Sequence, residues 1–165
     1  MIAASFKKTL FCADTSLLID LWIEYYPIEH FKDLWKLLDE LIEVGRFFAP
    51  HEVWNELANK DPSLRKWCRK RQKMFRRPTR ADCKHLREIL QNDSGCVDKF
   101  KRGPHADALV VAIAKGTGAI VVTRERRSGS DSTLIKTRIP TLCKKNNVPC
   151  IATVNEFRTA IGWKY

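Results

Sequence analysis

Residues 119–123 of the chain read AIVVT. The run is apolar or β-branched throughout, has the length of a strand, and follows directly on Gly118. A strand without alternating polar positions is typical of a parallel sheet that helices cover on both faces. These five residues therefore predict an α/β fold, and further strands of the same kind are expected elsewhere in the chain.

Three other stretches have the composition of short strands. They are TLFCA at residues 9–13, RFFA at 46–49 and PCI at 149–151. Apolar residues recur at helical spacing between them, most clearly in the stretch 28–45, where a stripe runs from Phe31 to Ile42. Strands that alternate with helices predict a three-layer fold, with a mainly parallel central sheet and helices on both of its faces.

The chain length of 165 residues suits a single domain spanning 1–165. Within it, the stretch 61–103 is expected to be a helical, basic elaboration, with one helix over 62–74 and another beginning at Thr79. Ser16 is expected to cap the first helix, and Thr153 the last.

The net charge of +11 is concentrated in one segment. Nine basic residues and no acidic ones lie between Arg65 and Arg80, whereas the rest of the chain carries 21 basic and 19 acidic residues. Such a patch is typical of a protein that binds a polyanion, although a solvated helix face that aids solubility has the same pattern. The residues expected to contact RNA phosphates are Arg65, Lys66, Arg69, Lys70, Lys73, Arg76, Arg77 and Arg80.

Several classes of protein are disfavoured by what the sequence lacks. No apolar run is long enough to cross a bilayer, and the first eight residues do not resemble a signal peptide, so we expect a soluble, cytoplasmic protein. The six cysteines form no CxxC pair, so neither a zinc site nor a disulfide framework is expected. A nucleotide-dependent oxidoreductase is disfavoured because no GxGxxG turn follows the first strand.

Two acidic residues follow predicted strands. Asp14 comes directly after the first strand, and Glu125 lies two residues beyond AIVVT. Because functional sites in open α/β sheets form at the carboxyl ends of the strands, these two carboxylates are expected to converge.

Asp107 and Glu56 are further candidates, and each has an alternative. Asp107 lies on the apolar face of its predicted helix, which fits either a bound metal or favourable interaction with the helix dipole, worth about 0.3–1 kcal/mol. Glu56 and Glu52 are one turn apart on the same helix, and the pattern alone does not choose between them. A cluster of carboxylates persists when divalent cations neutralise it, and Mg²⁺ and Mn²⁺ prefer such hard oxygen ligands.

Four stretches resemble the motifs of PIN-domain nucleases, in the order found in that family. They are FCADTSLLID at 11–20, PHEVWNEL at 50–57, HADALVVAIA at 105–114 and AIVVTRE at 119–125. The resemblance places the catalytic and metal-binding acids at Asp14, Glu56, Asp107 and Glu125, with Ser16 and Thr123 in supporting positions. Glu125 stands where aspartate is usual, and the stretch 61–103 is longer and more basic than in compact members.

The resemblance implies a PIN-like fold and an endoribonuclease that depends on Mg²⁺ or Mn²⁺, similar to the VapC-type toxins of toxin–antitoxin systems. Hydrolysis would leave a 5′-phosphate and a 3′-hydroxyl. The implied partners are RNA, a protein antitoxin and a second copy of the chain. Two alternatives stay open: a non-catalytic module that binds RNA or a protein partner through the same fold, and a nuclease directed at DNA.

Overall fold

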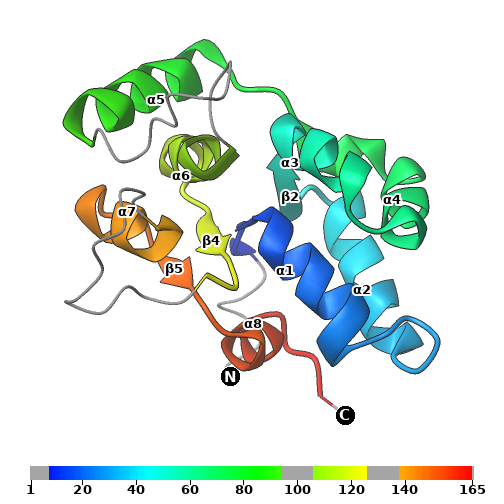
Figure 1. The fold of residues 1–165 in the computed structure, drawn as a ribbon. Helices are drawn as coiled ribbons and strands as arrows, with labels where there is room; N and C mark the ends of the chain where they lie inside the picture. The colour runs from blue at the N-terminus through cyan, green and yellow to red at the C-terminus, as the bar shows by residue number, and fades with distance from the viewer. Residues whose placement is uncertain (1–7, 94–105, 126–137, 165) are drawn as a thin grey trace.

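The central sheet has five strands in the order β3-β2-β1-β4-β5 (Figure 1). The computed structural model describes residues 8–93, 106–125 and 138–164. All strand pairings within these ranges are parallel, which confirms the predicted α/β class. The strands are β1 (Phe11–Ala13), β2 (Phe47–Pro50), β3 (Phe75–Arg76), β4 (Ile120–Val122) and β5 (Cys150–Ile151).

Helices connect the strands and surround the sheet (Figure 1). The α-helices are α1 (Thr15–Asp20), α2 (Lys32–Glu43), α3 (His51–Glu56), α4 (Pro62–Arg69), α5 (Arg80–Asn92), α6 (Ala106–Thr117), α7 (Ile139–Lys145) and α8 (Val154–Ala160). Shorter segments extend three of the connections: the π-helical turn η3 (Leu21–Tyr25) and the 3₁₀ turns η4 (Leu57–Asn59) and η5 (Gln72–Met74). None of the helices described is both long and apolar enough to span a bilayer.

The first strand shows why helices cover both faces of the sheet. Successive side chains of a strand point to opposite faces. The Phe11 ring meets Phe157 of α8 edge to face, with 5.6 Å between ring centroids. The next residue, Cys12, points the other way, and its Sγ lies 3.7 Å from the Val110 carbonyl oxygen of α6. Helices therefore pack on each side, as predicted, with α6 and α7 on one face and α1, α2 and α8 on the other (Figure 1).

The strand order creates the place where a site can form. From β1 the chain crosses to β2 and β3 on one side, and β4 and β5 lie on the other, so the order reverses between β1 and β4. Such a reversal opens a crevice at the carboxyl ends of the strands. The Asp14 backbone nitrogen donates to the Val122 carbonyl oxygen over 3.0 Å, which holds the ends of β1 and β4 together.

One strand was not predicted from the sequence. Residues 62–74 were expected to form one helix, but α4 ends at Arg69 and the turn η5 leads into β3, which pairs with β2. This strand is only two residues long, Phe75 and Arg76, which is too short to show an alternation of apolar and polar residues. The basic segment therefore contributes the edge strand of the main sheet.

Candidate active site

Two of the four candidate acids lie where β1 and β4 end. Asp14 follows β1 directly and is buried, and Glu125 follows β4. The other two come from helices: Glu56 is the last residue of α3, and Asp107 lies in the first turn of α6. We call Asp14, Glu56, Asp107 and Glu125 the acidic group.

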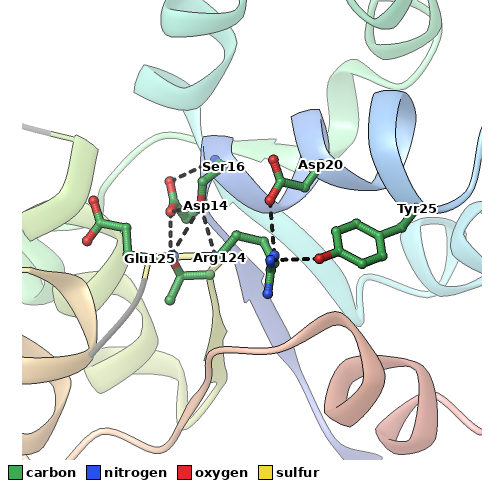
Figure 2. A network of polar contacts seen from close by, with 7 residues as sticks. Asp14, Ser16, Asp20, Tyr25, Arg124 and Glu125 are labelled. Atoms are coloured by element: carbon green, nitrogen blue, oxygen red, sulfur yellow. Dashed lines mark hydrogen bonds and ion pairs between the residues drawn. The ribbon is translucent and has the colours of Figure 1, made fainter. Parts of the chain in front are cut away.

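Two hydroxyls orient the Asp14 carboxylate (Figure 2). The Ser16 and Thr123 hydroxyls each donate to Asp14 Oδ2 over 2.7 Å. Oδ1 receives a longer bond of 3.3 Å from the Ser16 backbone nitrogen. Because Oδ2 already accepts two short bonds, Oδ1 is the oxygen with more capacity to bind a ligand.

The N-cap of the first helix is Asp14, and the expectation that Ser16 caps it is wrong. Asp14 has an extended backbone, and its side chain accepts from the Ser16 nitrogen, as an N-cap does. Ser16 instead lies inside the first turn, where its hydroxyl is available to Asp14.

The two hydroxyls are themselves held by the backbone that follows β4. The Arg124 nitrogen donates to Ser16 Oγ over 2.9 Å, and the Glu125 nitrogen donates to Thr123 Oγ1 over 3.1 Å. Since each hydroxyl oxygen accepts one of these bonds, its own hydrogen is free to point at Asp14. The loop after β4 therefore sets the direction of the Asp14 carboxylate.

The Asp14 carboxyl has an unusual pKa. Burial raises it from the ordinary value of 3.8 to about 6, against the lowering effect of the Ser16 and Thr123 hydrogen bonds. The negative charges of Asp107 and Glu125 raise the pKa of Asp14 further. Asp107 and Glu125 thus lie close enough to Asp14 for their charges to act on its carboxylate.

Thr15, the first residue of α1 and one that the sequence analysis did not single out, links Glu56 to the segment that follows Asp14. The Thr15 hydroxyl donates to Glu56 Oε2. Glu52 makes no such contact, and its Oε2 is buried without a hydrogen-bond partner in the described part of the chain. The geometry therefore favours Glu56 over Glu52 as a neighbour of Asp14.

Glu125 is held in place by a helix. Its Oε2 accepts a hydrogen bond of 2.8 Å from the backbone nitrogen of Ile139, the first residue of α7. The longer side chain of glutamate, compared with aspartate, is used here to reach that nitrogen while the charge still acts on Asp14.

The donor chemistry of the acidic group fits a hard divalent cation. All four members offer carboxylate oxygens, and the charges of Asp107 and Glu125 add to burial in raising the pKa of Asp14. Within the ranges described, no three His, Cys, Asp or Glu side chains already lie close enough together to enclose an ion. Asp14 has an oxygen with remaining capacity, Oδ1, and the charge of Asp107 acts on it, so these two carboxylates are the first candidates to hold a cation.

Four of the nine cations in the basic segment make structural contacts. Arg71 forms a two-bond ion pair with Asp39 of α2 and covers the Trp67 ring at 4.0 Å. Lys73 pairs with Glu43, also on α2. The guanidinium groups of Arg65 and Arg76 donate to backbone carbonyl oxygens and lie over the rings of Trp54 and Phe48.

The other five cations form what we call the exposed basic set. Each is solvent-exposed and has no ion pair with any residue that the structure describes. They are Lys66, Arg69, Lys70, Arg77 and Arg80. The basic segment contains no acidic residues, but acidic residues of α2 neutralise two of its cations, Arg71 and Lys73.

A second network beside Asp14 had no counterpart in the sequence analysis. The Arg124 side chain donates to Asp20 Oδ2 over 3.0 Å and to the Tyr25 hydroxyl over 2.9 Å (Figure 2). Its position inside AIVVTRE, between Thr123 and Glu125, was the available signal.

The raised pKa of Asp14 predicts how stability depends on pH. Between about pH 4 and pH 6 the folded state holds the Asp14 proton more tightly than the unfolded state, so stability falls as the pH rises through this window and stays lower above it. In a chelating buffer at pH 7, Asp14→Asn should raise the free energy of unfolding by up to about 2–3 kcal/mol. Urea unfolding from pH 4 to pH 7 measures this. Glu29→Gln, at an exposed turn, is the control, and equal pH profiles for wild type and Asp14→Asn would contradict the assignment.

The division of the basic segment predicts unequal effects on folding. Arg71→Ala removes an ion pair, a ring contact and a hydrogen bond to the Trp67 carbonyl, so it should cost about 1–2 kcal/mol of stability. Lys70→Ala, at the exposed neighbouring position, should stay within about 0.5 kcal/mol of wild type. Thermal unfolding of the two variants measures these losses of stability. Similar losses in both would show that the distinction between structural and exposed cations is wrong.

Comparison with known proteins gives a family. No curated protein matches the chain. One family covers almost its whole length, from residue 11 to residue 165, including all four members of the acidic group. The chain belongs to this family, which is described as a domain of unknown function (DUF4411).

Proposed function

We propose that this protein is a PIN-like endoribonuclease that depends on Mg²⁺ or Mn²⁺. The observation that carries the proposal is the Asp14 carboxylate, which is buried at the reversal of strand order, oriented by two hydroxyls and repelled by Asp107 and Glu125. Burying a carboxylate among like charges is costly, and its role as the N-cap of α1 does not require acidic neighbours. A bound cation would remove that cost, which is the reason to assign the acidic group to catalysis.

The residues of the acidic group have separable roles in this proposal. Asp14 and Asp107 would bind the cation, while Glu56 and Glu125 would complete the negative environment from the positions in which Thr15 and Ile139 hold them. When bound, such a cation supplies polarisation of a phosphodiester and activation of water. Ser16 and Thr123 would act by holding Asp14 in one orientation, so that its Oδ1 faces the ligand.

The exposed basic set would bind the phosphates that the acidic group repels. These five side chains lie on α4, at the start of α5 and in the turns that follow α4 and β3, and none is used in an ion pair within the described ranges. Neutralising RNA phosphates releases counterions and adds affinity that does not depend on base sequence.

The test of catalysis compares acid-to-amide variants. Asp14→Asn and Asp107→Asn should each reduce cleavage by more than about 100-fold, because even partners that only orient a metal ligand contribute about 10–100-fold. Purified proteins are incubated with a panel of single-stranded RNA and DNA oligonucleotides, with Mg²⁺, Mn²⁺ or a chelator. Glu29→Gln should cleave like wild type, and circular dichroism should show the same fold in every variant.

The outcomes separate the alternatives. Cleavage of DNA but not RNA would favour a DNA-directed nuclease. RNA binding without cleavage, and without thermal stabilisation by Mg²⁺ or Mn²⁺ that is lost in Asp14→Asn, would favour a non-catalytic module. Full activity in both amide variants would overturn the assignment of the acidic group.

The test of the exposed basic set is the salt dependence of binding. If all five cations contact phosphates, the logarithm of the affinity for single-stranded RNA should fall against the logarithm of salt concentration with a slope of about −3.5. The double variant Arg69→Ala/Lys70→Ala should reduce this slope by about 1.4. Lys115→Ala/Lys144→Ala, which removes two exposed cations from α6 and α7, is the matched control. Equal slopes in the two double variants would exclude this role.

A further inference from the structure

We infer that Arg124 is a phosphate-anchoring residue of the candidate active site. Its guanidinium would bind one phosphate of a single-stranded RNA, next to the linkage held at the acidic group. The inference rests on the proposed function and adds to it the residue that brings positive charge to the acidic group.

The backbone places Arg124 against the acidic group. It follows Thr123, whose hydroxyl donates to Asp14, and its own nitrogen donates to the Ser16 hydroxyl that binds the same carboxylate. Its side chain and that of Glu125 leave the end of β4 in opposite directions (Figure 2). The loop therefore presents a carboxylate and a guanidinium on the two sides of Asp14.

The guanidinium is oriented before any ligand binds. Nε donates to Asp20 Oδ2 over 3.0 Å and Nη2 donates to the Tyr25 hydroxyl over 2.9 Å. The Tyr25 ring also supports it, with 5.0 Å between Cζ and the ring centroid. A guanidinium that is already held loses little conformational freedom when it binds a phosphate.

Its contacts leave one side of the group available. Asp20 and Tyr25 take the edge formed by Nε and Nη2. Nη1 makes no hydrogen bond with any residue in the described ranges, so the end of the fork formed by Nη1 and Nη2 retains donors for a ligand. The Arg124 side chain is 23% exposed, which allows access from solvent. Two parallel N–H donors match the oxygens of a phosphate.

Arg71 differs from Arg124 in this respect. Arg71 uses two nitrogens on one carboxylate and a third on a carbonyl oxygen. Asp20 accepts only one bond from Arg124, from the edge opposite Nη1. A phosphate at the free end would therefore be nearer to the guanidinium charge than to the Asp20 charge, and the attraction would dominate.

The alternative is that Arg124 has only a structural role, in which its side chain connects η3 to the end of β4. Tyr25 ends the π-helical turn, and Asp20 ends α1, so the contacts are consistent with that task. The two readings differ in one measurable respect, because a structural pin has no preferred phosphate in the substrate.

The experiment removes one phosphate charge at a time. A single-stranded 2′-O-methyl RNA oligonucleotide is prepared with one neutral methylphosphonate linkage at each position in turn, and its affinity is measured by fluorescence anisotropy in a chelating buffer. For wild type, one linkage should cost about tenfold in affinity beyond the others. For Arg124→Ala, overall affinity should be about tenfold weaker, and that linkage should cost no more than its neighbours.

Two further variants complete the design. Arg124→Lys should recover part of the affinity, since it keeps the charge but not the fork. Asp20→Asn removes the ion pair with Arg124 but keeps the guanidinium. This variant should therefore still lose affinity when the same linkage is neutralised. Thermal unfolding of all variants shows whether each is folded at the assay temperature.

The outcomes distinguish this inference from the proposed function. The inference alone would be overturned if wild type binds and cleaves RNA but shows no linkage at which neutralisation costs more affinity than elsewhere. It would also be overturned if Arg124→Ala has the same affinity profile as wild type. The inference would also be overturned if Asp20→Asn abolished the sensitivity as fully as Arg124→Ala does. Wild type that neither binds nor cleaves RNA would overturn both.

Discussion

The hydrogen bonds that join Asp14 to Ser16 and Thr123 are the constraint around which the candidate site is organised. They connect the end of β1 to the end of β4, and Asp14 also begins α1 as its N-cap. A buried carboxylate would be tolerated poorly in a region whose neighbours are apolar, and two hydroxyl donors reduce but do not remove that cost, since the pKa of Asp14 is still raised to about 6. The fold thus retains an energetic cost at one carboxylate, and a positively charged ligand would relieve it.

The layers of the fold could be predicted because the buried strands are continuous in the sequence. AIVVT and the TLFCA stretch are apolar on both faces, as a strand between two helical layers must be. The strand β3 could not be predicted from the sequence. Two residues are too few to reveal an alternating pattern, and one of them, Arg76, is basic. Its guanidinium lies over the Phe48 ring and donates to the Gly45 carbonyl oxygen, so the aliphatic stem serves as apolar cover.

The site could be predicted as a set of acids but not as a geometry. Asp14 and Glu125 were found from their places after strands, and the resemblance chose Glu56 over Glu52, a choice that the Thr15 hydrogen bond supports. The roles of the hydroxyls depend on contacts between residues more than 100 positions apart, such as Thr123 with Asp14, which no local pattern encodes. The mistaken cap at Ser16 has a local origin, since Asp14 and Ser16 are both good capping residues and only the backbone geometry decides between them.

The cations of the basic segment fall into two groups, those that make contacts within the fold and those that are exposed to solvent. Trp67 is buried and packs against Trp35, with 4.9 Å between ring centroids, so it is unavailable for stacking on a base. Arg71 covers that tryptophan and pairs with α2, and the ion pair therefore stabilises the junction of α4 with α2. A count of basic residues overstates the charge that a polyanion would meet, because part of it is neutralised within the fold. The exposed basic set contributes positive potential outside the protein. A guanidinium beside the Asp14 network comes from a different element, the loop after β4 that carries Arg124. Electrostatic attraction at a distance and contact at the acidic group are therefore served by separate parts of the sequence.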